Sequence, residues 1–345
     1  MLSPETQALW DAEPGWLDTA SYGLPPRPAW DALTEALAAW RRGRGSWEDW
    51  TRSTEAARAC FARLVGTDVA SVAIGSAASE LVGLVAASLP KGAKVVVPDI
   101  EFTSNLFPWL VQAEHGVEVL TVPPASLAES VDARTTLVAF SAVQSSTGEV
   151  ADLDAIAGAA ERYGALTVVD ATQCCGWLPL DATRFDAVVC GAYKWLMSPR
   201  GTAFGAFSER LGEQLLPLYA GWYAGADVHD SYYGPPLRLA SSARRFDVSP
   251  SWFSWVGTAP TLAVVEGIGI DAIHSHDVAL ANRFCAGLGL PPADSAIVSC
   301  SIHGATERLA RAGIRAPTRA GRLRASFHLY NTAAEVDAAL DALTA

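Results

Sequence analysis

Polar side chains follow three short apolar runs that are typical of β-strands. Asp170 comes after LTVV, Lys194 after VVCGAY, and Ser141 to Gln144 after LVAF. Because ligands of α/β sheets bind beyond the carboxyl ends of the strands, these positions are the first candidates for a site. A buried lysine is costly unless its charge is paired or removed, and an imine with an aldehyde removes that charge. A desolvated lysine is also the better nucleophile.

Asp170 and Lys194 together indicate pyridoxal 5′-phosphate (PLP) as that aldehyde. A carboxylate at Asp170 would complement a protonated pyridine nitrogen, which keeps the ring an electron sink for a carbanion at the substrate Cα. Two other interpretations stay open on the residues alone. Asp170 could cap a helix, and Lys194 could lie on the surface at the end of a strand.

The elements around these residues follow an alternating strand and helix pattern. VAFSAV and LTVVD flank DLDAIAGAAERYG, where Asp152 is the expected N-cap and Gly164 the residue just past the helix, so this stretch predicts a β-α-β unit. The strand runs are apolar throughout, as in a parallel sheet that is covered on both faces. The predicted fold class is therefore α/β. The other predicted elements are helices at 30–42 and 79–89 and strands at 94–99, 117–123 and 185–193.

The pattern changes after about residue 255. Residues 258–289 form long helical segments, and RLRASFHLYNTAAEVDAALDAL predicts a strand, a turn at Asn331 and Thr332, and a closing helix. We expect a large domain over 18–265, a small C-terminal domain over 266–345, and an N-terminal segment, 1–17, that packs on the small domain.

The motif VVDATQ, followed by DAVVCGAYKWLMSPRGTAFG, resembles the class V aminotransferase family of PLP enzymes. That family includes cysteine desulfurases, isopenicillin-N-epimerase-like proteins, kynureninases and C–S lyases. The resemblance extends from LDTASYG to RLRASFHLYNT and so spans nearly the whole chain. It implies the fold-type-I PLP architecture, with a mostly parallel sheet in the large domain and a small C-terminal α+β domain. It also implies a homodimer with shared active sites.

The resemblance assigns the cofactor residues position by position. Lys194 matches the Schiff-base lysine, Asp170 the partner of the pyridine nitrogen, and Gln173 the residue that binds the PLP 3′-oxygen. The turn GSAASE matches the phosphate-binding turn into a helix, where small residues let backbone amides approach a dianion. The remaining matches are the amides of Ala77, Ala78 and Ser79, a hydroxyl of Ser76 or Ser79, Phe102 as the stacking ring, Tyr193 in place of a phosphate-binding histidine, and Ser249 toward the neighbouring subunit's phosphate site.

The substrate side is assigned in the same way. Arg324 matches the arginine that binds the substrate α-carboxylate as a bidentate fork. Tyr22 lies in the segment that closes over the substrate in the family. Many relatives have a histidine after the strand that contains VAF, whereas this chain has SAVQSSTG, and Gln144 is the polar residue we expect to reach the cofactor or substrate. His328 could approach the substrate or lie in the core.

The reaction depends on what happens at Cα and Cβ of an amino-acid substrate. Cysteine desulfurases carry a catalytic cysteine before the position of Arg324, but GIRAPTRAGRLRAS contains none, and Cys300 lies well upstream. We therefore expect β-elimination, as in C–S lyases acting on a cysteine conjugate. An aminotransferase is the second possibility, with Arg319 or Arg322 binding a second carboxylate. Epimerase-like or decarboxylating chemistry and a non-catalytic PLP-fold protein also stay open.

Composition limits the partners. The formal net charge of −12 argues against nucleic acid and against anionic membrane surfaces. No run of about 18 apolar residues predicts a transmembrane helix, and the acidic start is unlike a signal peptide. The six cysteines, which include the adjacent Cys174 and Cys175, form no C-x-x-C and have no metal-ligand spacing, so we expect reduced core thiols, no metal and a cytoplasmic protein.

Overall fold

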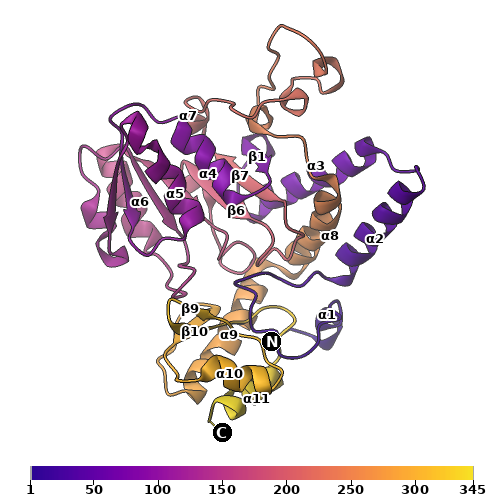
Figure 1. Ribbon diagram of the computed structural model, residues 1–345, viewed down its shortest axis with the longest axis vertical. Coiled ribbons are helices and arrows are strands. Elements are labelled where there is room, and N and C mark those ends of the chain that lie inside the picture. The colour runs from indigo at the N-terminus through magenta and orange to yellow at the C-terminus, as the bar shows by residue number, and fades with distance from the viewer. Residues whose placement is uncertain (1, 345) are drawn as a thin grey trace.

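The computed structural model describes residues 2–344, so the first residue of the predicted N-terminal segment and the last residue of the predicted small domain lie outside it (Figure 1). A seven-stranded sheet forms the centre of the large domain, in the order β1-β7-β6-β5-β4-β2-β3. Neighbouring strands from β6 through β3 are parallel, and β7 runs antiparallel to both β6 and β1. The α/β prediction is therefore confirmed. The strands are β1 (Val72–Gly75), β2 (Lys94–Pro98), β3 (Glu118–Val122), β4 (Leu137–Ser141), β5 (Leu166–Asp170), β6 (Ala187–Gly191) and β7 (Ala203–Phe207).

Helices cover both faces of this sheet, which explains why the strands are apolar throughout. One face packs on α4 (Ala78–Ala87), α5 (Thr103–Leu110) and α7 (Glu209–Gly212). The other face packs on α3 (Trp47–Leu64), α6 (Leu153–Tyr163) and α8 (Trp252–Ile268). Two further helices, α1 (Pro4–Gln7) and α2 (Arg27–Arg41), precede them in the chain, and α2 lies against α8 at the outer side of the domain (Figure 1).

The predicted β-α-β unit is present as β4, α6 and β5. The Asp152 side chain accepts a hydrogen bond from the Ala155 amide at 3.0 Å, which caps the start of α6. Gly164 ends the helix in the left-handed conformation. Because β4 and β5 are parallel and in register, Ser141 lies beside Asp170 at the carboxyl ends of the two strands.

A smaller antiparallel sheet in the order β8-β10-β9 forms the C-terminal part of the chain, below the large sheet in Figure 1. Its own apolar cluster includes Leu17, so the N-terminal segment packs here. The Leu17 amide also donates to the Arg315 carbonyl at 3.0 Å. The elements are α9 (Ile270–Gly287), β8 (Ile297–Cys300), α10 (Ala305–Arg311), β9 (Thr318–Arg319), β10 (Arg322–Ser326) and α11 (Ala333–Thr344).

The change from α8 to α9 occurs at Gly269, whose φ of +87° favours glycine. The two helices meet at 84°. This break follows closely after the predicted domain boundary at 265, which falls inside α8. Within residues 2–344 no single helix is long and apolar enough to cross a membrane. Among the described helices, only α8 and α9 taken together, across the bend between them, have the required length and apolarity.

Candidate active site

A cavity of about 260 Å³ lies at the carboxyl ends of β5 and β6. Asp170 is the last residue of β5, and Lys194 follows the end of β6. Since the two strands are neighbours and parallel, their carboxyl ends meet at one edge of the sheet. Apart from Ser249, the residues that the sequence assigns to the cofactor line this cavity: Ser76, Ala77, Ala78, Ser79, Phe102, Asp170, Gln173, Tyr193 and Lys194.

Lys194 is held in this cavity with little access to water. Its side chain is buried, and its ammonium nitrogen lies 5.3 Å from the centroid of the Phe102 ring. Burial is the main cause of a lowered pKa of Lys194, about 8, with Arg324 and Arg200 adding to the effect and Asp170 opposing it. Gly23 packs against its backbone, because a Cβ there would lie 2.1 Å from the Lys194 carbonyl oxygen.

Asp170 is buried opposite this lysine. It accepts a hydrogen bond from the Thr172 amide at 2.8 Å. Burial raises the pKa of Asp170, against the effects of Thr172 and Lys194. Within the described residues no ion pair joins Asp170 to Lys194, although both line the same cavity. Asp170 and Lys194 are thus two buried ionisable groups that line one cavity without contacting each other. This arrangement leaves room for a bound group between them, such as the pyridine ring of PLP.

The helix α4 starts at the same cavity. Ala77 is its N-cap residue, and no side chain caps the helix. The Ser76 amide donates to the Glu80 carboxylate at 2.7 Å and the Ser76 hydroxyl donates to it as well. The Glu80 amide donates to the Ala77 carbonyl at 3.1 Å. In this first turn, the amides of Ala78 and Ser79 are thus the ones left for another acceptor within residues 2–344, as an anion-binding helix start requires.

Arg200 adds a positive charge to this end of the cavity. Its guanidinium carbon lies 4.1 Å from the centroid of the Tyr193 ring, and both residues line the cavity. No carboxylate pairs with Arg200 in residues 2–344. The helix start, the Tyr193 hydroxyl and Arg200 together suit a phosphate group.

Glu101 is a buried carboxylate directly behind Phe102. It accepts hydrogen bonds from the Ser141 amide at 2.8 Å, from the Phe102 amide at 2.9 Å and from the Gln144 side chain at 3.2 Å. The Ser141 hydroxyl donates to it as well. Burial is the main reason that the pKa of Glu101 is raised, and the charge of Asp170 adds to it. Glu101 thus fixes the segment that carries Phe102 against the end of β4.

Gln173, Ser145 and Arg324 form one hydrogen-bonded group at the opposite side of the cavity. The Gln173 amide nitrogen donates to the Ser145 hydroxyl and to the Ala20 carbonyl, both at 3.0 Å. Because both of its hydrogens are used, the predicted bond from Gln173 to the PLP 3′-oxygen needs one of these contacts to open. Arg324 donates to the Ser145 carbonyl at 2.7 Å and to its hydroxyl at 3.2 Å. The Nε of Arg324, also buried, has no hydrogen-bond partner within residues 2–344.

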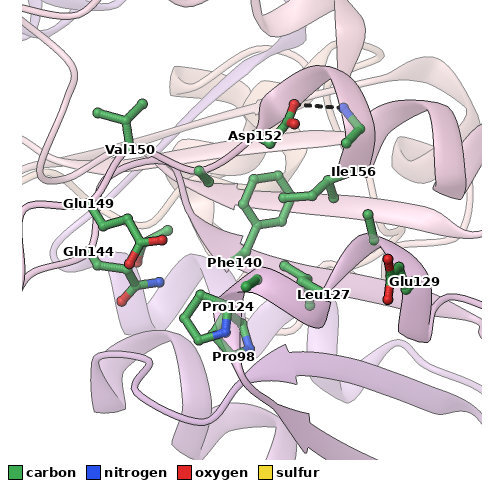
Figure 2. A pocket seen from close by; sticks show the side chains of 15 residues that line it. Pro98, Pro124, Leu127, Glu129, Phe140, Gln144, Glu149, Val150, Asp152 and Ile156 are labelled. Carbon is green, nitrogen blue, oxygen red and sulfur yellow. Dashed lines mark hydrogen bonds between the residues drawn. The ribbon is translucent and has the colours of Figure 1, made fainter. Parts of the chain in front are cut away.

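Four predicted residues lie outside the cavity lining: Arg324, which contacts the lining residue Ser145, and Gln144, Tyr22 and Ser249. Gln144 lines a second cavity of about 380 Å³, where it lies beside Glu149 (Figure 2). The Tyr22 ring is 41% exposed and packs 4.5 Å from the Trp16 ring. Ser249 is exposed, in a segment without regular structure. Their predicted contacts stay predictions, and that of Ser249 concerns a second subunit.

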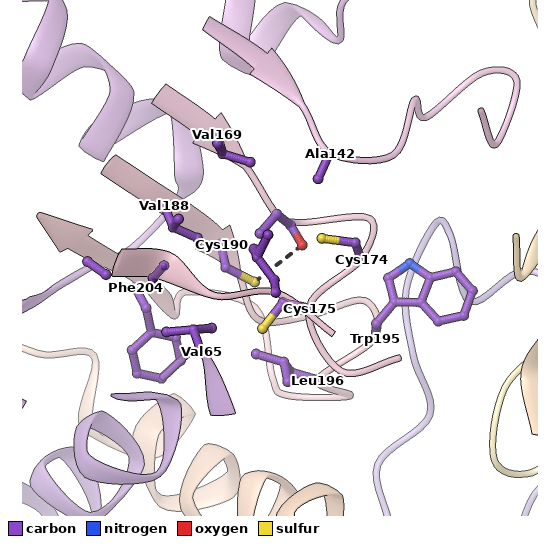
Figure 3. Packing of buried hydrophobic residues seen from close by; sticks show 14 of the residues in the cluster. Val65, Ala142, Val169, Cys174, Cys175, Val188, Cys190, Trp195, Leu196 and Phe204 are labelled. Atoms are coloured by element: carbon purple, nitrogen blue, oxygen red, sulfur yellow. Dashed lines mark hydrogen bonds between the residues drawn. The ribbon is translucent and has the colours of Figure 1, made fainter. Parts of the chain in front are cut away.

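His328 and the cysteines lie in the core. His328 shares a hydrogen bond of 2.7 Å with Asp277 and donates to the Trp195 carbonyl at 2.9 Å, so it binds the backbone next to Lys194. Cys174 and Cys175 are buried among apolar neighbours of the large sheet, with Cys190 close by (Figure 3). Burial raises the pKa of Cys174 well above its usual range, so its thiol stays protonated.

Sequence reasoning missed Ser145, Arg200 and Glu101. Ser145 comes one residue after the polar stretch that follows LVAF, and Glu101 comes three residues after the end of β2. The rule that directs attention to the ends of parallel strands could have identified both of them. For Arg200 the only signal was its place in the SPRG turn after Lys194.

Comparisons with known proteins agree with this geometry. The family model "Aminotransferase class-V" matches residues 31–292. An uncharacterized aminotransferase of Bacillus subtilis, YcbU, is 28% identical over 87% of this chain and 85% of its own. A probable cysteine desulfurase of Methanothermobacter thermautotrophicus is 29% identical over 78% of this chain and 70% of its own.

A solved structure is also similar over nearly its whole length. It is the cystine C–S lyase C-DES in complex with its reaction product cysteine persulfide, with a TM-score of 0.86, 20% identity, and coverage of 96% of this chain and 97% of that one. Another structure of this lyase holds glycine covalently linked to the PLP cofactor. The likeness confirms the fold-type-I PLP architecture. The cavity that Lys194 and Asp170 line agrees with this architecture. The matched family model shows that the chain belongs to the class V aminotransferase family and is a PLP-dependent enzyme.

Proposed function

We propose that this enzyme catalyses β-elimination from a cysteine S-conjugate. Water and the conjugate would give a thiol, pyruvate and ammonium. The observation that carries the proposal is the composition of the cavity: Lys194 faces it as a base, Arg324 borders it through Ser145, and none of its lining residues is a cysteine.

Bound PLP would supply an electron sink for the carbanion that forms when the substrate Cα loses its proton. In this chain, Lys194 is the base that can take that proton. With a pKa of about 8, its free Nζ is neutral in roughly a tenth of molecules at pH 7, far more than an exposed lysine would be. The same amine can return a proton later in the reaction.

Arg324 would orient the substrate by its α-carboxylate. The guanidinium is almost fully buried, and its contacts to Ser145 and Ser21 hold it at one angle. A fixed fork of this kind suits a planar carboxylate. The Cα–H bond is then presented to Lys194 in a reproducible geometry, which is a large part of catalysis.

The cysteines favour elimination over persulfide formation on an enzyme thiol. Cys300 lies on β8 and is 3% exposed, and burial raises its pKa. A nucleophilic cysteine needs an accessible site and a lowered pKa. Within residues 2–344 all six cysteines are buried.

Transamination is the second candidate function. One observation favours it: Arg319 donates to the Ser21 hydroxyl at 3.1 Å, and Arg324 donates to the same hydroxyl at 2.9 Å. A second cation beside the α-carboxylate site is a device that aminotransferases use for a distal carboxylate.

The purified holoenzyme distinguishes these reactions when it is given cysteine S-conjugates in one assay and an amino donor plus a keto acid in another. Pyruvate and ammonia without a keto acid support the lyase. Turnover that requires the keto acid refutes it in favour of the aminotransferase. Racemisation of the substrate refutes it in favour of an epimerase, and release of CO₂ in favour of a decarboxylase. As a matched control, Lys194→Ala is expected to stop turnover while the circular dichroism spectrum is retained.

We also propose a homodimer in which Ser249 reaches the partner's phosphate site. Exposed apolar side chains support an interface, among them Trp30 and Trp40 on α2, each 60% exposed. Mixing Lys194→Ala with Ser249→Ala subunits tests this. Activity recovered in the mixed dimer supports shared sites, and a monomer in light scattering refutes them.

A further inference from the structure

Three arginines lie on one face of the small sheet. Arg322 and Arg324 are two residues apart on β10, so their side chains point to the same face. Arg319 on β9 is the direct partner of Arg322 across the ladder, which places it on that face too. In a chain with a net charge of −12, such a local excess of positive charge needs an explanation.

Few carboxylates balance this face. Asp18 lies 3.6 Å from Arg324 and also 3.6 Å from Arg315, so one acid is shared between two arginines. Within residues 2–344 neither Arg319 nor Arg322 forms an ion pair. The pKa of Arg324 is lowered to about 10, mainly by burial; the charge of Arg319 contributes to the lowering, and Asp18 opposes it. The face therefore has positive charge that protein groups leave uncompensated.

The charges are placed where a substrate would extend. Arg324 contacts Ser145, which lines the Lys194 cavity. Its other nitrogen shares the Ser21 hydroxyl with Arg319. A chain of hydrogen bonds thus leads from the cavity through Ser145, Arg324 and Ser21 to Arg319. Two guanidinium groups that donate to one neutral hydroxyl repel each other, and an anion between them would relieve that repulsion.

The backbone fixes Arg319 at this place. The turn between β9 and β10 consists of Ala320 and Gly321, with φ of +46° and +76°. A positive φ at alanine is strained, and such strain is often found at ligand sites. This two-residue turn sets the register that pairs Arg319 with Arg322.

We propose that Arg319 binds a second anionic group at the far end of the substrate side chain, so that the enzyme selects amino acids with a distal carboxylate. This inference rests on the proposed function in one respect, that the substrate is an amino acid held at Arg324. It does not depend on whether elimination or transamination follows. Arg322 is the less suitable partner, because its guanidinium donates to the Ser299 hydroxyl at 3.1 Å and to the Ser299 carbonyl at 2.8 Å, on β8. The Arg319 guanidinium also makes two hydrogen bonds, one to the Thr318 carbonyl at 3.0 Å, but the other is to Ser21, beside Arg324.

A pair of nearly isosteric substrates tests the proposal. S-carboxymethylcysteine and S-carbamoylmethylcysteine differ only in the charge of the distal group. We expect the holoenzyme to prefer the acid in kcat/KM by about tenfold or more, as a charge-assisted hydrogen bond allows. Arg319→Gln should remove this preference, mostly through KM. Arg311→Gln, the same change at an exposed arginine of α10, should keep it.

A binding measurement separates this inference from the reaction. Glutarate and its monoamide, glutaramate, have no amine and cannot react, and calorimetry gives their affinities for the holoenzyme. If both cysteine conjugates are inert but glutarate binds more tightly and Arg319→Gln removes the difference, β-elimination fails and the anion site stands. Equal binding of the two compounds, or a preference that survives Arg319→Gln, overturns the inference.

Discussion

The buried pair of Asp277 and His328 should contribute more to stability than any exposed ion pair of the small domain. Both side chains are fully buried, and Asp277 Oδ2 lies 2.7 Å from His328 Nδ1. The other ring nitrogen must donate, because its partner is the Trp195 carbonyl at 2.9 Å. One proton is therefore shared between the aspartate and the histidine, and removal of the aspartate leaves a buried polar ring nitrogen without its partner.

Asp277→Ala is expected to lower the free energy of unfolding by about 3–5 kcal/mol, the usual cost of removing one member of a buried pair. The chain offers a matched control in another Asp–His pair, whose histidine, His274, is on the same helix as Asp277. His274 lies 3.0 Å from Asp294, whose side chain is 73% exposed. Asp294→Ala should cost about 0–1 kcal/mol, because water screens and replaces an exposed partner.

Urea unfolding of the two variants, followed by fluorescence, measures this difference. The comparison requires that both variants have the same m value, the slope of the unfolding free energy against urea concentration. Asp277→Asn, which removes the charge but little volume, shows how much of the loss comes from a cavity. Trp195 also donates to the Gln173 side chain at 2.9 Å, so Asp277→Ala should release PLP faster as well. Equal losses in Asp277→Ala and Asp294→Ala would refute the reasoning.

Three further predictions concern the cofactor side. The rate at which apoenzyme takes up PLP should rise with pH, reach half of its maximum near pH 8 and level off above it, because the pKa of Lys194 is lowered to about 8, mainly by burial, and the neutral amine is the nucleophile; a midpoint near the ordinary lysine pKa in stopped-flow absorbance would contradict this. Arg200→Gln should weaken PLP binding by about 1.5–3 kcal/mol, the range of a hydrogen bond to a charged group, measured by fluorescence titration, whereas Arg162→Gln on α6 should leave it unchanged. Glu101→Gln should destabilise the protein by about 1–3 kcal/mol in urea, since an NH₂ group would face the donors of Ser141 and Gln144; unchanged stability would show that one of those donors can turn away.

The fold could be predicted where the sequence repeats one local pattern, a short and mostly apolar run. β2, β4, β5 and β6 are short, buried, mostly apolar runs, β3 has the more exposed sequence EVLTV, and α6 has a capping residue at both ends. The parallel part of the sheet could therefore be predicted from residue types. Two strands of the large sheet, β1 and β7, were not predicted; their sequences are VAIG and AFGAF. Their small residues carry little strand preference, and their antiparallel pairing depends on contacts distant in sequence.

The cofactor side of the site was predictable for a related reason. Asp170 and Lys194 follow directly on two of those apolar strands, so their positions are fixed by the sheet itself. The choice between Gln144 and Ser145 could not be made in this way. They follow the end of β4 in a loop, and the loop conformation directs Ser145 to the cavity and Gln144 to Glu101.

The substrate side depends on contacts that no local pattern contains. Arg324 reaches Ser145 and Ser21, which lie 179 and 303 residues away in the chain. Both arginines of the proposed substrate site are on the small sheet, whereas Asp170 ends β5 of the large sheet and Lys194 follows the end of β6. The two functions are therefore carried by different parts of the fold. Substitutions in the β9–β10 turn should change which amino acid is accepted without changing the affinity for PLP, because the arginines meet the cofactor residues only through Ser145 and the segment around Ser21.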